Sequence, residues 1–315
     1  MAPEEPGSAQ PDAASDVIKA IPLRRPGRWI AATVILLLVV LFLYGAATNA
    51  NFQWSTYRAY LFDRRITKGV WATLQLTFLA MMLGVVLGVG LAVMRLSANP
   101  VLRSVAWVYL WVFRGTPVYV QLVFWGLFSS IYPHLSLGIP FAHQFAHFDV
   151  QSLQAFFFFA ALGLGLNEAA YMAEIVRAGI SSVGEGQSEA ATALGMPWGL
   201  TMRRIVLPQA MRVIIPPTGN ELISMLKTTS LVIAVPFTGD LYSQARQISG
   251  ANFRPVPLLM VASTWYLAIT SVLMVGQYFL EKHYAKGSSR TMTPRQLRAL
   301  AKAMTGAGGA QGGGM

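Results

Sequence analysis

The chain has 315 residues, of which 54% are hydrophobic and only 12% are charged, and its mean hydropathy of +0.49 is too high for a soluble globular protein. Its formal net charge of +11 does not indicate nucleic-acid binding, because no dense patch of basic and aromatic residues accompanies it. The absence of cysteine excludes disulfides, a thiolate nucleophile and a cysteine-based metal site. The apolar residues fall in runs long enough to cross a bilayer, so the sequence predicts an all-α polytopic membrane protein.

The N-terminal region combines a polar tail with an apolar run. Residues 1–28 are rich in Pro, Ala, Ser and acidic residues and turn basic toward Arg28, so we expect a disordered tail. The run Trp29–Ala47 predicts a first transmembrane helix within residues 29–48. A cleaved signal peptide is the alternative, since small residues follow at Ala47 and Ala50, although the preceding tail is long for the basic region of a signal peptide.

Five further apolar segments follow, which predicts about six transmembrane helices in all. They are Ile66–Met94, Ser104–Tyr132, Val150–Ile180, Ala210–Val235 and Val256–Leu280. In the first of these five, Gly84 and Gly88 form a small-xxx-small pair that allows another helix to approach closely, and simple filling of the bilayer is the alternative. The segment Ala210–Val235 contains Pro216 and Pro217, which cannot donate backbone hydrogen bonds, so we expect it to be bent or discontinuous.

Two segments, Tyr132–Asp149 and Thr238–Arg254, are too polar to span a bilayer, and we expect both to be outer loops. The first contains His134, and its residues His143 and His147 are four apart, as metal ligands on a helix can be. A membrane metalloenzyme is therefore an alternative. Gln144 follows His143, so there is no H-E-x-x-H motif and no evident general base, and we expect no metal site.

The distribution of basic residues predicts the orientation in the membrane. Six alternating spans place the N-terminal tail, the turn Arg95–Arg103, the polar stretch Glu185–Pro208 and the basic, Gly-rich tail 285–315 on one side. Lysines and arginines are more numerous there than on the other side, which the positive-inside rule assigns to the cytoplasm. We therefore expect both termini to be cytoplasmic, and the C-terminal tail to be disordered.

The polar stretch begins with a predicted short helix over Glu185–Leu194, which consists largely of good helix formers and is ended by Gly195, Met196 and Pro197. One face of this helix is apolar and comprises Ala190, Ala191 and Leu194. The opposite face is acidic and comprises Glu185 and Glu189. Such a helix suits a groove on another protein, whereas an ordinary helix between two spans is the alternative.

Glu189-Ala190-Ala191, Gly195 and Ile205–Pro208 match the pattern EAA-x3-G-x9-I-x-L-P at every fixed position. The stretch resembles the EAA loop of the permease subunits of bacterial ABC importers. The resemblance covers about Ile66–Tyr284. It extends to the polar amino-acid branch of these permeases through Arg114–Pro117 with Gln121, Tyr171–Ile180, Leu207–Arg212, Pro216-Pro217, Asn220-Glu221 and Leu226–Leu231. It implies a five-span permease core over residues 66–284, preceded by one extra N-terminal span.

The resemblance also implies that the EAA loop, residues 185–208, carries a coupling helix that docks on a separate ATPase. The chain has no G-x-x-x-x-G-K-[ST] motif of its own, so we expect it to have no ATPase site. The residues implied to couple to the ATPase are Glu185, Gly186, Gln187, Glu189, Ala190, Ala191, Leu194, Gly195 and Arg203. The implied partners are two ABC ATPase subunits, which bind ATP and Mg²⁺, an extracytoplasmic solute-binding protein, and a second identical or related permease. The implied substrate is a polar amino acid, and no cofactor is expected on this chain.

Charged residues inside spans are costly and mark candidate functional sites. The expected substrate path comprises Arg114, Thr116, Gln121, Glu168, Tyr171, Asn220, Glu221 and Lys227. Glu168 and Tyr171 share a helix face and are expected to meet the substrate ammonium, while Arg114 would meet the carboxylate. The alternative is that such charges pair with one another to hold the bundle together, which we expect for Glu174 and Arg177. A secondary amino-acid transporter or channel that uses the buried charges is the alternative function.

Overall fold

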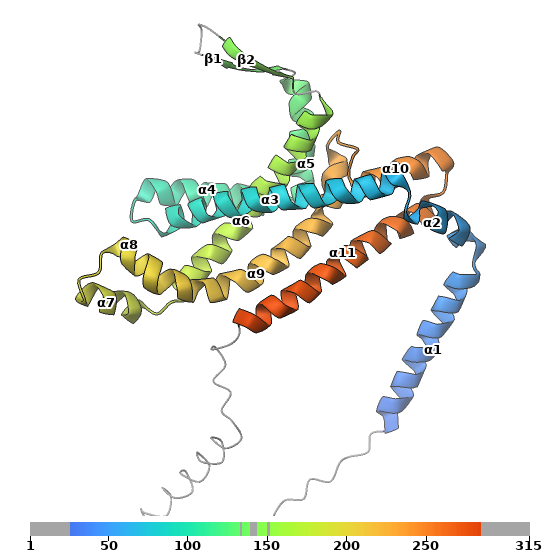
Figure 1. Ribbon diagram of the computed structural model, residues 1–315, viewed down its shortest axis with the longest axis horizontal. Coiled ribbons are helices and arrows are strands. Elements are labelled where there is room, and N and C mark those ends of the chain that lie inside the picture. Colours follow the sequence, from blue (N-terminus) through green and yellow to red (C-terminus); the bar gives the residue numbers. More distant parts are fainter. Residues whose placement is uncertain (1–25, 133, 139–143, 150–151, 285–315) are drawn as a thin grey trace, which may run out of the picture. The chain divides into compact units, whose positions relative to one another are not determined.

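The computed structural model describes residues 26–132, 134–138, 144–149 and 152–284 (Figure 1). Its elements are α1 (Pro26–Thr48), η1 (Ala50–Phe52), α2 (Trp54–Leu61), α3 (Arg64–Leu96), α4 (Pro100–Gly115), α5 (Val118–Ile131), β1 (His134–Gly138), β2 (Gln144–Asp149), α6 (Leu153–Ser181), α7 (Glu185–Ala193), α8 (Trp198–Thr201), η2 (Met202–Val206), α9 (Leu207–Thr228), η3 (Thr229–Ala234), α10 (Leu241–Asn252) and α11 (Pro255–Tyr284). The predicted helical class is confirmed, because the described chain is helical apart from one two-stranded hairpin.

The chain divides into two units that meet between Phe52 and Gln53, and each is described by itself. In the first unit, α1 has 23 residues and exposes apolar side chains such as Leu38 and Phe42 around its whole circumference. A helix of this length and uniform apolarity suits the hydrocarbon core of a bilayer. A helix is present at the predicted residues 29–48, and its role as an extra transmembrane span stays a prediction. The predicted disordered tails lie outside the described residues, except for the last residues before Trp29, which begin α1.

The second unit is built on the contact between α3 and α6, which lie against each other (Figure 1). A Cβ atom added to Gly88 would lie 2.5 Å from the Cβ atom of Met172 and 3.1 Å from the carbonyl oxygen of Ala169. One added to Gly84 would lie 2.6 Å from the Cγ atom of Glu168. The close approach predicted from the two glycines is therefore confirmed, and a larger residue at either position would push the helices apart.

The remaining helices pack around this pair. Apolar residues of α3, α5, α6 and α9 form one core cluster that includes Leu76, Leu122, Leu164 and Met225. A second cluster joins α3 to α10 and α11 through Ile66, Leu241 and Leu258, among others. Because these clusters involve segments far apart in the sequence, they fix α9 and α11 beside the central pair.

Proline acts differently in two parts of the chain. Pro216 and Pro217 lie inside α9, which is continuous, so of the two expected outcomes, a bent or a discontinuous helix, the second is wrong. The φ angle of proline is compatible with a helix, and a helix packed against its neighbours tolerates the backbone N–H groups that proline lacks. In addition, Gln277 on α11 donates a hydrogen bond to the carbonyl oxygen of Pro216 at 2.8 Å. By contrast, α4 ends at Gly115 and α5 begins at Val118, so the apolar segment predicted over residues 104–132 consists of two helices that are divided at Thr116 and Pro117.

The polar segments also contain regular structure that was not predicted. The outer segment after residue 238 contains α10, whose first turn is capped by the Asp240 carboxylate, which accepts a hydrogen bond from the Ser243 amide at 3.1 Å. The strands β1 and β2 form an antiparallel hairpin in which His134 pairs with Asp149. His147 therefore lies on a strand, not on the helix that the metal-site alternative requires, and His143 lies outside the described residues. Among the described residues, no group of three metal-ligating side chains comes together.

Four described helices are long and apolar enough to cross a membrane: Gly27–Thr48, Arg64–Leu96, Ala155–Ser181 and Pro255–Tyr284. The helix α5 is shorter, and α9 carries several polar and charged residues. The total of six spans therefore stays a prediction.

The glycine contact predicts a specific effect of one methyl group. Gly88→Ala should destabilise the protein by about 1–3 kcal/mol, because the added Cβ overlaps Met172 and the backbone of α6. Gly90→Ala is the matched control, since a Cβ there meets nothing within 4 Å and alanine favours the helix. The measurement is the thermal unfolding midpoint of the purified protein in detergent. Equal midpoints for the two variants would contradict the proposed contact.

Candidate functional site

A cavity of about 460 Å³ lies beside the break between α4 and α5. Its volume falls within the range of small-molecule sites, roughly 300–1,000 Å³. It is lined by Arg114, Gly115, Thr116, Pro117 and Val118 at the break, by Leu164, Asn167, Glu168 and Tyr171 of α6, and by Glu221, Ser224, Met225 and Thr228 of α9. The cavity is therefore formed where four helices, α4, α5, α6 and α9, converge.

Two side-chain amides stabilise the helix break. Pro117 has no N–H group to continue the helix by bonding to the carbonyl oxygen of Phe113. Instead, that oxygen accepts hydrogen bonds from Gln121 Nε2 at 3.0 Å and from Asn167 Nδ2 at 3.1 Å. Gln121 Nε2 also contacts Thr116 Oγ1 at 2.8 Å, and Asn167 Nδ2 donates to Gln121 Oε1 at 3.1 Å. The break is thus a fixed feature with its backbone satisfied, as a low-dielectric environment requires.

Acidic groups outnumber basic groups in the cavity wall. Glu168 is buried, and its Oε1 atom has no hydrogen-bond partner among the described residues. Glu221 of α9 is half-buried and lines the same cavity. The guanidinium of Arg114 lies 5.6 Å from the centroid of the Tyr171 ring, within the range of a cation–π interaction. Two carboxylates and one guanidinium therefore surround a space that can accept both acidic and basic groups of a ligand.

The structure brings together five of the eight residues expected in a substrate path. Arg114, Thr116, Glu168, Tyr171 and Glu221 line the cavity. Gln121 supports the rim from behind, whereas Asn220 and Lys227 are exposed and do not line the cavity.

Three polar residues of the wall, Asn167, Ser224 and Thr228, were not anticipated. Ser224 and Thr228 follow Glu221 by three and seven residues, a spacing that places all three on one helix face and was readable from the sequence.

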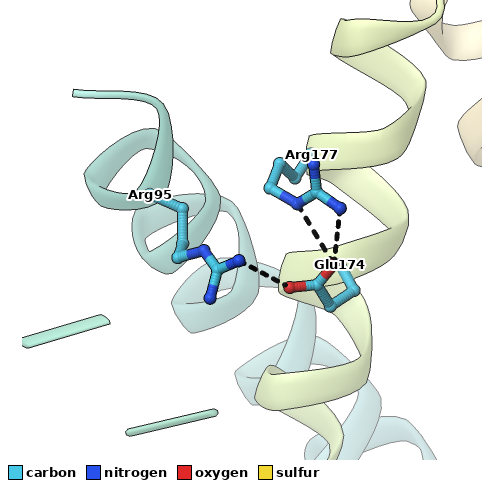
Figure 2. A network of polar contacts seen from close by, with 3 residues as sticks. All are labelled: Arg95, Glu174 and Arg177. Carbon is cyan, nitrogen blue, oxygen red and sulfur yellow. Dashed lines mark hydrogen bonds and ion pairs between the residues drawn. The ribbon is translucent and has the colours of Figure 1, made fainter. Parts of the chain in front are cut away.

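An ionic network joins α3 to α6 beyond the cavity (Figure 2). Glu174 Oε2 accepts hydrogen bonds from Arg177 Nη2 at 2.8 Å and from Arg177 Nε at 3.1 Å, which confirms the expected pair. Glu174 Oε1 also lies 3.6 Å from Arg95 Nη2, a partner that was not anticipated because Arg95 lies far away in the sequence. The carboxylate therefore connects the last turn of α3 to α6.

The helix α7 follows α6 after a short turn and covers the helix predicted over Glu185–Leu194 except for its last residue. It ends as predicted, because Gly195 adopts a φ of +74°, a conformation that residues with a Cβ atom rarely adopt. The Met196 amide donates to the Ala191 carbonyl at 3.0 Å, and the Gly195 amide donates to the Thr192 carbonyl at 2.9 Å. This is a Schellman motif, which ends the helix and turns the chain toward α8.

Most of the residues expected on the docking surface are exposed. They are Glu185, Gly186, Gln187, Glu189, Ala190, Leu194, Gly195 and Arg203. Ala191 is only 1% exposed, so its placement on the approachable face is wrong; it packs within its own chain. Leu194 is 81% exposed and Trp198 is 73% exposed, so two large apolar side chains protrude from an otherwise polar stretch. Exposed apolar groups of this kind are typical of a protein–protein contact.

The polar stretch joins α9 through a π-helical turn, Met202–Val206, which lies just before Pro208. The helix α8, the π-helix η2 and α9 follow one another without a gap, and the Leu207 amide donates to the Met202 carbonyl five residues earlier. Pro208, the next residue, has no amide hydrogen with which to continue an α-helical ladder. One turn of the helix therefore contains an extra residue at this point, and the helix continues beyond it.

Comparison with known proteins agrees with this architecture. The family described as "Binding-protein-dependent transport system inner membrane component" matches residues 84–286, more than half of the chain. The arginine transport system permease protein ArgU of Corynebacterium glutamicum is 61% identical, over 91% of this chain and 89% of that protein. The histidine/lysine/arginine/ornithine transport system permease protein HisM of Escherichia coli is 35% identical, over 65% of this chain and 83% of that protein.

A solved structure gives the same result. The crystal structure of an amino acid ABC transporter with histidines contains a chain that is 33% identical and superposes with a TM-score of 0.59, covering 74% of this chain and 98% of that one. On the family match and these relatives, the chain belongs to the binding-protein-dependent transport system inner membrane components, the membrane-embedded permease subunits of ABC importers.

Proposed function

We propose that this permease forms the membrane path by which an ABC importer takes up a cationic amino acid. The observation that carries the proposal is the cavity wall, in which Glu168 and Glu221 face the same space as Arg114. A cationic amino acid has two positive groups and one carboxylate, so its charges complement this set. The transport names of ArgU and HisM, relatives of the chain, support the same substrate class. Family membership gives no support to a secondary transporter or channel.

Each charged group has a defined role in this proposal. Glu168, whose Oε1 atom lacks a partner among the described residues, accepts hydrogen bonds from a cationic group of the substrate. Arg114 can turn from the Tyr171 ring to meet the substrate carboxylate. The bound amino acid thereby replaces water around groups that are costly to leave unpaired in the membrane.

The energy comes from partners in this proposal. Two ATPase subunits bind ATP and Mg²⁺ and dock on α7 of this chain and on that of a second permease, while an external solute-binding protein delivers the amino acid. Both termini then lie in the cytoplasm, and the chain itself breaks no bond. The helix α6 supports the mechanism, because it carries Glu168 and Tyr171 at the cavity and ends three residues before α7 begins. A movement of α7 is therefore transmitted directly to the cavity wall.

Neutralising one carboxylate should reduce transport selectively. Glu168→Gln is expected to lower the uptake of arginine by the complete importer in proteoliposomes about tenfold or more, because it removes a charge-assisted contact. Glu281→Gln is the matched control, since Glu281 lies near the end of α11, outside the cavity, and its Oε1 atom only accepts from Gln277. Unchanged arginine uptake by Glu168→Gln, with normal expression, would contradict a cationic-substrate cavity.

Truncating the exposed leucine should weaken ATPase docking without affecting the fold. Leu194→Ala removes an apolar side chain that is 81% exposed in the isolated chain, so burial in a partner would contribute roughly 1.5–3 kcal/mol. We expect about 10- to 100-fold weaker association of the ATPase with the detergent-purified permease. Phe253→Ala is the control, because Phe253 is 88% exposed and lies in the opposite, outer segment. An equal effect of both substitutions on ATPase association would refute docking at α7.

A further inference from the structure

A second cavity, of about 360 Å³, lies near the turn between α3 and α4. We call it the basic recess and define it by its lining residues, which are Arg95, Leu96, Arg103, Ser104, Trp107 and Arg177. It shares no lining residue with the cavity at the helix break. Its three arginines come from three different helices, α3, α4 and α6, so the concentration of positive charge is a product of the fold.

Positive charge in the basic recess is only partly neutralised. Glu174 is shared by Arg95 and Arg177, as Figure 2 shows. No residue in the described part of the chain forms an ion pair with Arg103. Three guanidinium groups therefore face one carboxylate. The side chains of Arg95, Arg177 and Glu174 are only 24%, 34% and 23% exposed, whereas Arg103 is exposed, so its charge is accessible to an anion from outside.

The arginines also retain unused hydrogen-bond donors. Arg177 engages Glu174 through Nε and Nη2. Arg95 approaches Glu174 only at 3.6 Å, which is longer than a good hydrogen bond. A guanidinium carries five N–H donors in a planar fork that matches the oxygens of a phosphate group. The recess therefore suits an anion with several oxygens, such as a phosphate, better than it suits a neutral ligand.

The surroundings of the basic recess favour a lipid as the source of that phosphate. The turn lies on the side of the membrane that the basic residues of the sequence assign to the cytoplasm, where anionic lipids are concentrated. Trp107 and Trp111 on α4 are 55% and 65% exposed, and their rings are stacked with centroids 6.3 Å apart. Tryptophan prefers the level of the lipid headgroups. Val101, Val105 and Val108 on α4 are also exposed and offer an apolar surface for acyl chains.

We propose that the basic recess binds the phosphate of an anionic phospholipid from the cytoplasmic leaflet, with the acyl chains lying along the exposed residues of α4. The phosphate supplies the anion that Arg103 lacks and joins α4 to the network of Arg95, Glu174 and Arg177. Because α6 carries Arg177 and leads directly to α7, a bound lipid steadies the helix that supports the docking surface. This site does not depend on which amino acid is transported.

Lipid binding to the assembled, full-length importer tests the proposal. Native mass spectrometry would compare retention of phosphatidylglycerol with that of phosphatidylcholine of identical acyl chains. We expect wild type to prefer phosphatidylglycerol and Arg103→Gln to retain it about five- to tenfold less. Arg103→Lys should keep most of the preference. Arg58→Gln is the matched control, because it removes the same charge from an exposed position on α2, outside the basic recess.

Each other outcome would overturn the proposal. Equal retention of the two lipids, or unchanged retention by a normally folded Arg103→Gln variant, would exclude a phosphate site at the basic recess. Displacement of phosphatidylglycerol by millimolar inorganic phosphate would assign the site to a soluble phosphate compound instead of a lipid. Loss of the ATPase from Arg103→Gln, with lipid retention unchanged, would assign the arginines to a protein contact.

Discussion

The contact between α3 and α6 is the constraint on which the rest of the structure depends. Gly84 and Gly88 let the two helices approach so closely that a single methyl group would meet Glu168 or Met172. This approach fixes α6, and with it Glu168 and Tyr171 in the cavity wall. It also brings the end of α3 within reach of Glu174, since Arg95 and Glu174 are otherwise separated by two intervening helices and a hairpin. Close packing of small residues is a main source of helix association in membranes, where lipid removes the usual hydrophobic advantage.

Much of this fold was predictable because the strongest signals are local. Long apolar runs located α1, α3, α6 and α11, and the glycine pair predicted the central contact. Helix-forming residues before Gly195 predicted α7 to within one residue. The effect of proline was not predictable in the same way. Pro117 ends a helix where Gln121 and Asn167 take over the freed carbonyl, whereas Pro216 and Pro217 leave α9 continuous. The outcome depends on tertiary partners that the local sequence does not specify.

The candidate site shows the same limit. Charged residues inside apolar segments were conspicuous, so Arg114, Glu168 and Glu221 were identified from the sequence. Neutral polar residues such as Asn167 were less conspicuous, because an amide in a helix is unremarkable until a partner is known. Lys227 was included for its charge alone, and the turn of α9 directs it away from the cavity. Residue type therefore identified the charged groups of the candidate site, whereas helix orientation and packing determine which of those residues line the cavity.

The polar stretch between α6 and α9 is held at both ends by helices that line one cavity. Glu168 of α6 and Glu221 of α9 both belong to its lining. Toward α9 the stretch has no break, because α8, η2 and α9 follow one another without a gap. A movement at the exposed Trp198, where α8 begins, would therefore be transmitted along this continuous helical segment to α9. Displacing the stretch therefore alters the spacing between two carboxylates. Under the proposed function, a change in that spacing would change how strongly the two carboxylates attract a cationic substrate, because Coulombic attraction falls with distance.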